Sequence, residues 1–225
     1  MQFLQYTVQV ITLVIVLLAI SNWKEVKKAK IELLVYLQFL SFLVEIIALI
    51  TIALYRNSLI TYNLFILFQP VFMLLLIGSW NSPTFISNYL RYLSTAFFIF
   101  WLFESFYLNI IWLKPSYWSL LIGDMMIIFT LAVYLIHLSN TSVTPIIRSP
   151  RFWIAASYLI YCAGSSLLLS INENLISSIK IDSDFPINFN HIHIVIHIFT
   201  SLLILKALLC LPKQRTLQYS SSFSR

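Results

Sequence analysis

The chain has 225 residues, of which 60% are hydrophobic, 16% aromatic and only 10% charged, and its formal net charge is +6. Soluble domains carry roughly a quarter charged residues, so a water-soluble fold of this length could not bury so much apolar surface. The composition excludes a soluble domain and predicts an all-α polytopic membrane protein, surrounded by the lipid bilayer. The basic residues lie in short loops between apolar segments, so the net charge does not indicate a nucleic-acid partner.

Seven segments are apolar enough to span a bilayer, which takes about 20 mainly apolar residues. In chain order they cover about 3–21, 32–55, 59–80, 90–112, 117–138, 151–171 and 189–211. Pro, Asn and Ser clusters separate them, and such residues end helices. We expect one seven-helix transmembrane bundle over residues 1–212, followed by a short basic cytoplasmic tail over residues 213–225.

The loop charges predict the orientation. With an outside N-terminus, the cytoplasmic side receives Lys24, Lys27, Lys28, Lys30, Arg91, Arg148, Arg151, Lys213, Arg215 and Arg225. The outer side receives only Arg56, Lys114 and Lys180. Cytoplasmic loops are enriched in Lys and Arg, and this bias arises here only with an odd number of spans. We therefore predict an outside N-terminus and a cytoplasmic C-terminus in the inner membrane of a bacterium.

Polar side chains inside the spans are the candidates for function, since ionisable groups in a bilayer are costly. The ionisable candidates are Glu45, Glu104, Asp124, His193, His197 and Lys206, and the strongest neutral ones are Asn63 and Gln69. At ~1.5 Å per residue, the acids, the histidines and Gln69 lie in the outer half of the membrane. Lys206 lies toward the inner side, where its ammonium is expected to reach the interface.

Helical spacing places several polar residues on shared faces. These stripes are His193–His197–Thr200–Ser201, Gln38–Ser41–Glu45, Tyr158–Tyr161–Cys162–Ser165 and Tyr62–Gln69. Hydrocarbon cannot satisfy such groups, so they should face the bundle interior. We expect a polar ligand-binding cavity formed by Glu45, Asn63, Gln69, Glu104, Asp124, Tyr161, His193, His197 and Ser201. The alternative is that these groups only pair with one another as interhelical hydrogen bonds.

The His193–His197 pair has a second interpretation, because two imidazoles one turn apart suit zinc. Asp124, Glu45 or Glu104 could supply a third ligand. The pair resembles the late-helix HxxxH of seven-helix membrane hydrolases such as the alkaline ceramidases. That pattern also has a histidine in an early span and an Asp in the third, both of which this chain lacks. Histidines near carboxylates would also suit proton sensing.

Three short motifs carry a further resemblance. They fall on Tyr62, Phe65 and Gln69; on Ser149, Pro150, Phe152, Trp153, Ile154, Tyr161 and Gly164; and on Ile192, His193 and His197. The chain resembles, on these residues, a family of small seven-helix integral membrane proteins of bacteria. The resemblance implies seven spans and no particular activity. Gln69 stands where the family has an acid, and His197 where it has an amide, which weakens a metal or proton-relay role.

From these patterns we expect a non-enzymatic sensor or binding subunit for a small polar or amphiphilic ligand, working with a membrane protein partner and without a cofactor. The alternative is a membrane-embedded lipid hydrolase with Zn held by His193, His197 and Asp124, and with Asp124 or Glu45 as base. A transporter subunit comes third, because the chain has only three glycines and a single proline, Pro70, well inside a span. Transporters instead tend to break helices at a midplane site.

Overall fold

The computed structural model describes residues 2–55, 58–80, 84–108, 116–141, 145–178 and 189–222. Within these residues the chain is helical throughout, with no strand. The α-helices are α1 (Gln2–Ser21), α2 (Trp23–Ala29), α3 (Glu32–Tyr55), α4 (Leu59–Trp80), α5 (Thr84–Leu102), α7 (Tyr117–Thr141), α8 (Pro150–Ser178) and α9 (Phe189–Ser222). A π-helical turn, η1 (Phe103–Tyr107), continues α5, and a 3-10 turn, η2 (Ile146–Arg148), precedes α8.

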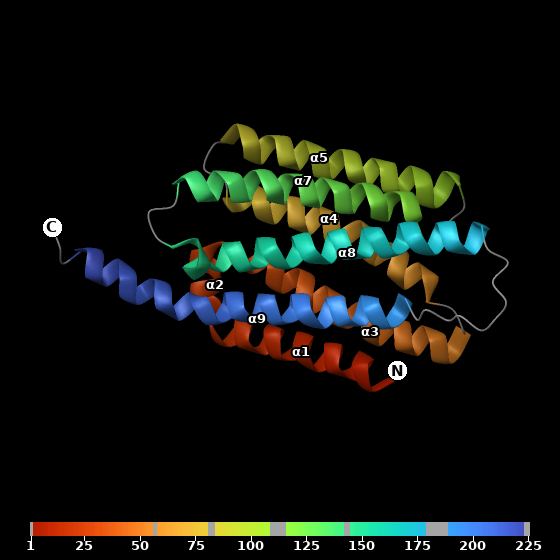
Figure 1. Ribbon diagram of the computed structural model, residues 1–225, viewed down its shortest axis with the longest axis horizontal. Helices are drawn as coiled ribbons and strands as arrows, with labels where there is room; N and C mark the ends of the chain where they lie inside the picture. Colours follow the sequence, from red (N-terminus) through yellow and green to blue (C-terminus); the bar gives the residue numbers. More distant parts are fainter. Residues whose placement is uncertain are drawn as a thin grey trace.

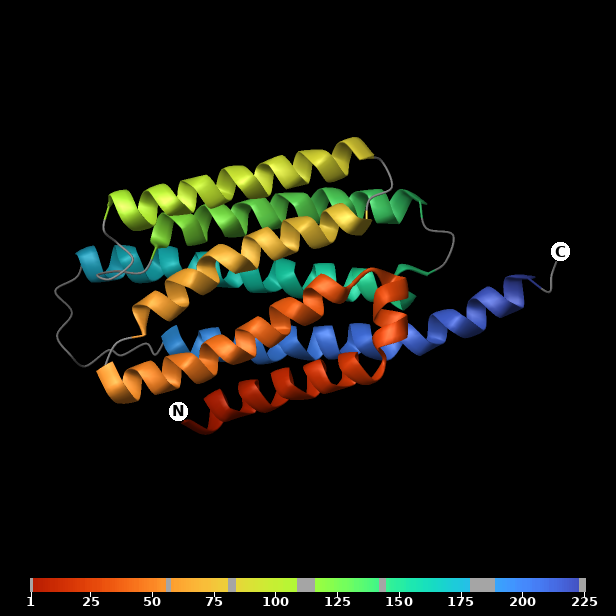
Figure 2. The same cartoon turned by 180° about the vertical axis from the view of Figure 1, so that it is seen from behind.

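The long helices lie side by side in one bundle, whereas α2 lies across one end of it (Figures 1 and 2). Six of them form a closed ring, in which α1 packs on α3, α3 on α4, α4 on α7, α7 on α8, α8 on α9, and α9 on α1. Helix α5 lies outside this ring, chiefly against α4. The ring encloses the space in which a site for a polar ligand could form.

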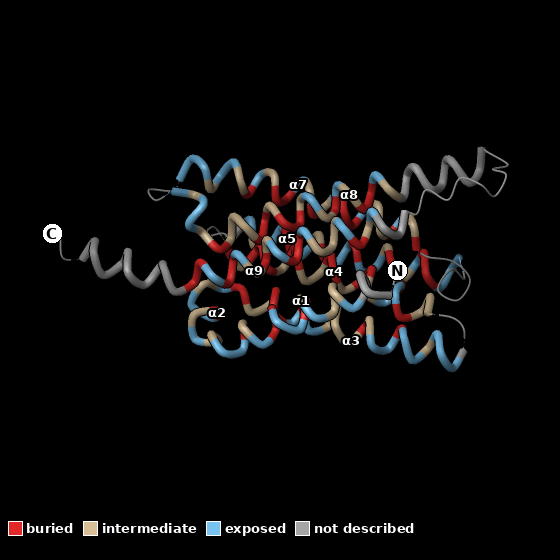
Figure 3. Tube along the Cα trace, turned by 60° about the horizontal axis from the view of Figure 1, so that its bottom comes forward, coloured by how far each residue is buried: buried red, intermediate tan, exposed pale blue. Residues whose placement is uncertain are grey.

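Side-chain burial follows this arrangement (Figure 3). Buried apolar residues face the middle of the ring, and they include Ile15 of α1, Leu34 of α3, Leu74 of α4, Ile127 of α7 and Ile154 of α8. Large apolar side chains also cover the outward faces, and Phe129 of α7 is 73% exposed. A continuous apolar exterior is what a bilayer requires.

Four of the described helices are long and apolar enough to cross a membrane: α3, α4, α7 and the Ile192–Leu211 part of α9. The number rises to five if α1 and α2, which meet at 88°, are counted as one bent span. The chain is thus a helical protein suited to a membrane. Helix α4 has the bounds expected for the third span, whereas α5 begins at Thr84, six residues before the expected start of the fourth.

The junction between α1 and α3 turns the chain through helix α2. The Asn22 side chain donates a hydrogen bond to the Leu18 carbonyl (2.9 Å), which ends α1. Lys30 takes the left-handed conformation at φ 56° and ends α2, with its N–H donating to the Lys27 carbonyl. We expected this segment to be a loop, because seven residues with three lysines show no apolar periodicity.

Two side chains hold α2 on the bundle. Arg151 of α8 donates from Nε (3.3 Å) and a terminal nitrogen (3.2 Å) to the Ala29 carbonyl. Trp80 of α4 donates from Nε1 to the Lys30 carbonyl (2.8 Å), and the Arg151 guanidinium lies 5.9 Å from the centre of the Trp80 ring. A cation at the carboxyl end of a helix is favourable because the carbonyls there lack partners.

The prediction of seven spans and their orientation also used charges that the structure does not cover. Arg56, Lys114, Lys180 and Arg225 lie outside the described residues. The side chains of Lys213 and Arg215, in the expected tail, are likewise outside the described part, although α9 continues there to Ser222.

Candidate functional site

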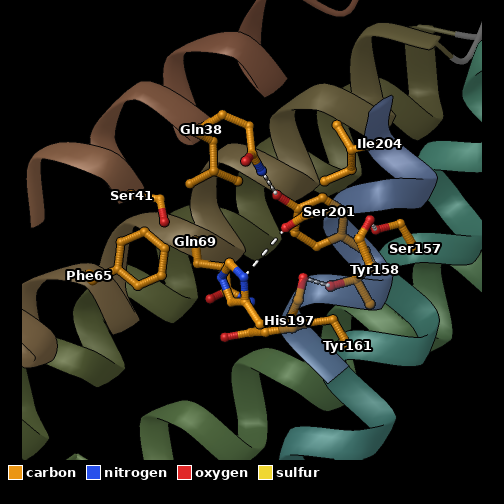
Figure 4. Close-up of a pocket in the computed structure, with 12 residues that line it drawn as sticks. Gln38, Ser41, Phe65, Gln69, Ser157, Tyr158, Tyr161, His197, Ser201 and Ile204 are labelled. Atoms are coloured by element: carbon orange, nitrogen blue, oxygen red, sulfur yellow. Dashed lines mark hydrogen bonds between the residues drawn. The ribbon is translucent and has the colours of Figure 1, made fainter. Parts of the chain in front are cut away.

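A small cavity lies inside the ring, between α3, α4, α8 and α9 (Figure 4). Its volume is about 30 Å³, and a buried water needs roughly 10–15 Å³, so there is room for about two waters. The cavity is lined by Leu37, Gln38, Ser41, Phe65, Gln69, Ser157, Tyr158, Tyr161, His197, Thr200, Ser201 and Ile204. None of these residues is acidic, Lys or Arg, so the cavity is polar without a permanently charged side chain.

Helix α8 is joined through this site to the helices on both sides of it. Gln38 Nε2 of α3 donates to the Tyr158 hydroxyl (3.2 Å), and Ser157 Oγ donates to the Thr200 carbonyl of α9 (2.9 Å). Because Ser157 and Tyr158 are adjacent in sequence, their side chains point in different directions from the same turn of α8. These polar groups therefore form hydrogen bonds between helices. This is what we expect if the polar residues only pair with one another and bind no ligand.

His197 forms the α9 wall of the cavity, together with two of the three other residues of its predicted stripe. Ser201 Oγ lies 3.4 Å from His197 Nδ1, a long contact, and Thr200 Oγ1 donates to the His197 carbonyl (3.0 Å). The Tyr161 ring of α8 stands edge-on to His197, with 5.7 Å between ring centres. His193 also lies against Tyr161, at 5.9 Å, but does not line the cavity.

Among the residues that line the cavity, Gln69 of α4 has a buried polar atom whose hydrogen bonding is incomplete. Its side chain is 4% exposed, and among the described residues its Nε2 has no partner in hydrogen-bond geometry; its one polar neighbour is the Cys162 thiol of α8, and sulfur is only a weak acceptor. In Figure 4 the Gln69 side chain extends toward His197 and Tyr161. A buried donor without a partner costs about 1–3 kcal/mol, so it is rare unless something outside the protein chain bonds to it.

Asp124 of α7 lies outside the lining. It is 1% exposed, and its Oδ2 accepts hydrogen bonds from Ser165 Oγ (2.7 Å) and Ser166 Oγ (3.1 Å) of α8. The carboxylate also interacts electrostatically with Tyr161, which does line the cavity. Asp124 thus does not line the cavity, and it joins α7 to α8.

Glu104 and Asn63 have a different role from the one we expected. Glu104, in the π-helical turn η1, accepts hydrogen bonds from the backbone N–H groups of Trp118 (3.1 Å) and Ser119 (2.7 Å) and from the Ser119 hydroxyl. Asn63 Oδ1 accepts from the Ser116 N–H (2.9 Å). These groups lie at the start of α7, where helical N–H groups lack partners and attract negative charge. Neither residue lines the cavity; both fix the beginning of α7.

Glu45 does not line the cavity, but it lies on the same face of α3 as two residues that do. It is half-buried on the face of α3 that carries Gln38 and Ser41, one turn past Ser41. Its carboxylate interacts electrostatically with Tyr62 of α4 and with Tyr161. Of the nine expected cavity residues, the structure brings Gln69, Tyr161, His197 and Ser201 together around the cavity.

The zinc alternative has no matching geometry. Among the described residues, no group of three His, Cys, Asp or Glu side chains lies close enough to hold a metal ion. His193, His197 and Asp124 do not converge, since Tyr161 contacts both histidines and Asp124 is bonded to Ser165 and Ser166. Lys206, expected to reach the inner interface, is exposed.

The cavity has lining residues that no sequence pattern indicated. Leu37 and Ile204 are apolar and have no signal that separates them from other core residues, whereas Phe65 belongs to the first of the three short motifs. Ser157 precedes the predicted Tyr158 stripe, and its bond to a backbone carbonyl depends on α9, more than forty positions away. Gln38, Ser41, Tyr158 and Thr200 belonged to the predicted stripes, and the structure adds that they line the cavity.

Comparison of the chain with protein-family models, with curated proteins and with solved structures finds no match.

Proposed function

We propose that this chain is a seven-span integral membrane protein whose central cavity binds a small polar solute, as a non-enzymatic sensor or binding subunit of a membrane complex. The observation that carries the proposal is the Nε2 of buried Gln69, which among the described residues has only the weakly accepting Cys162 thiol near it and faces a cavity lined by hydroxyl, amide and imidazole groups. A solute with an oxygen acceptor would supply a stronger partner than the described residues do.

The lining residues limit the charge and the size of the solute that the cavity could bind. No acidic, Lys or Arg side chain lines the cavity, so nothing there would compensate a full charge. The volume of about 30 Å³ suits a molecule of very few heavy atoms, unless the wall moves. We therefore propose a neutral solute such as an amide, urea or a short polyol. Phe65 and Tyr161, both half-buried, are the lining side chains that would have to turn for a larger one.

The seven spans and their orientation belong to the same proposal. Beyond the apolar helices, α8 has 29 residues, and α5 with η1 covers 84–107, so each exceeds the roughly 30 Å of a bilayer core at ~1.5 Å per residue. Together with α1 they complete seven. We place the N-terminus outside and the α2 end in the cytoplasm of a bacterium, where the exposed lysines of α2 would satisfy the positive-inside rule.

Solute binding is tested by thermal unfolding of the purified chain with acetamide, urea at low concentration and glycerol. A ligand present at one hundred times its dissociation constant stabilises the folded protein by about 2.7 kcal/mol. This raises Tm by several degrees. We expect at least one of these solutes to raise Tm in the wild type and not in Gln69→Leu, while Glu104→Ala, whose residue lies outside the cavity, keeps the response. If none distinguishes wild type from Gln69→Leu, Gln69 is not a binding residue.

A further inference from the structure

We infer that α2 and the residue that follows it form a binding site for the phosphate groups of anionic phospholipids, in the leaflet at the α2 end of the bundle. This inference is independent of the solute site. It rests on the way one face of α2 is held against the bundle while its lysines are presented on the other.

The position of α2 is the first step. It meets α1 at 88°, so if α1 crosses the membrane, α2 lies along the membrane surface at the level of the lipid headgroups. Figures 1 and 2 show it across the end of the bundle, beside the ends of α1 and α3 and along α9, which continues past it. Trp23 begins the helix and lies half-buried against Tyr36, with 5.9 Å between ring centres. Trp and Tyr are enriched at this depth because their rings are apolar and their polar atoms need water.

The second step is that α2 is fixed. Val26 is fully buried, and the carbonyls of Ala29 and Lys30 accept hydrogen bonds from Arg151 and Trp80. Both partners belong to long helices, α8 and α4. The backbone of α2 therefore does not have to become ordered when a ligand arrives, which removes part of the cost of binding.

The third step is the charge. Lys24, Lys27, Lys28 and Lys30 are all exposed, and among the described residues Lys24, Lys27 and Lys30 form no ion pair. The chain has eight acidic residues, and of these only Glu25 and Glu32 belong to the segment around α2. Four ammonium groups against two carboxylates leave an excess of positive charge on a surface that faces headgroups. Lysine binds phosphate as a point charge, and each basic residue near an anionic membrane adds to the attraction.

The experiment compares phosphatidylglycerol with phosphatidylcholine, titrated onto the purified full-length chain and counted by native mass spectrometry. We expect the wild type to prefer phosphatidylglycerol. The double variant Lys24→Gln/Lys27→Gln should lose about thirtyfold of that preference, since each lysine contributes about fivefold. Lys24→Arg/Lys27→Arg should retain it, because the charge is kept. In about 1 M salt the preference should disappear, because charges are then screened within ~3 Å.

The matched control removes two other exposed cations, Arg91 of α5 and Lys206 of α9. If Arg91→Gln/Lys206→Gln weakens the preference as much as Lys24→Gln/Lys27→Gln, the effect belongs to net charge and the site on α2 is refuted. An unchanged preference in the α2 variant also refutes it. So does competition by inorganic phosphate at the lipid's own concentration, which would assign the site to free anions. If only an acidic peptide, and no lipid, distinguishes the α2 variant from wild type, the surface belongs to a protein partner instead.

Discussion

Replacing Gln69 by Leu tests whether the central cavity is kept for a ligand. The Nε2 of Gln69 is buried without a partner among the described residues, and such a donor costs about 1–3 kcal/mol. Leu has nearly the same helix propensity as Gln and no polar atom. We therefore expect Gln69→Leu to raise the free energy of unfolding by about 2 kcal/mol, or Tm by roughly 4–8 °C, while abolishing solute binding.

Gln38→Leu is the matched control, because it removes the same chemical group from the opposite wall. Gln38 Nε2 bonds to the Tyr158 hydroxyl, and Tyr158 is only 6% exposed. Its loss leaves that hydroxyl without a partner, so we expect destabilisation by about 1–3 kcal/mol. Thermal unfolding in detergent, followed by circular dichroism, measures both. If Gln69→Leu destabilises the protein as Gln38→Leu does, Gln69 is a structural residue and the argument for a ligand fails.

Two further predictions concern the framework of the site. A Cβ on Gly123 would lie 2.6 Å from Cγ of the rigid Pro70 ring, whereas on Gly78 its nearest neighbour would be at 3.7 Å. Gly123→Ala should therefore destabilise by about 1–3 kcal/mol, and Gly78→Ala should stabilise by up to ~1 kcal/mol; equal effects in thermal unfolding would contradict the close approach of α4 and α7. Glu104→Ala should cost about 1.5–3 kcal/mol, because two N–H groups at the start of α7 lose a charged acceptor. Glu104→Ala should still bind the solute and the lipid. Loss of solute binding would show that Glu104 belongs to the binding site after all.

The walls of the cavity could be predicted from the sequence because they depend on local geometry. The spacing of Gln38 and Ser41 puts both on one face of α3, and the spacing of His197 and Ser201 does the same in α9, whatever the neighbouring helices are. A polar face in a membrane helix must turn inward, since lipid offers no partners. That argument needs no knowledge of which helices are adjacent.

The roles of Glu104 and Asn63 could not be predicted in this way. Glu104 lies in a π-helical turn, where the wider winding rotates side chains away from the face that α-helical counting assigns. Asn63 bonds to the backbone of Ser116, in a distant part of the chain that carries no matching pattern. Both residues accept hydrogen bonds from backbone N–H groups at the start of α7. In sequence, a polar residue near the end of a span looks the same whether it binds a ligand or a helix terminus. Helix α2 was missed because its order comes from Arg151 and Trp80.

The interhelical hydrogen bonds of Ser157 and Tyr158 join some of the helices around the cavity and not others. Through them α8 is fastened to α9 and to α3, so three of the four surrounding helices are connected at this level. Helix α4 contributes Phe65 and Gln69, and the interaction of Gln69 with the Cys162 thiol of α8 is not in hydrogen-bond geometry. A solute bonded both to Gln69 and to a polar group of α8 or α9 would therefore link α4 to these three helices across the cavity.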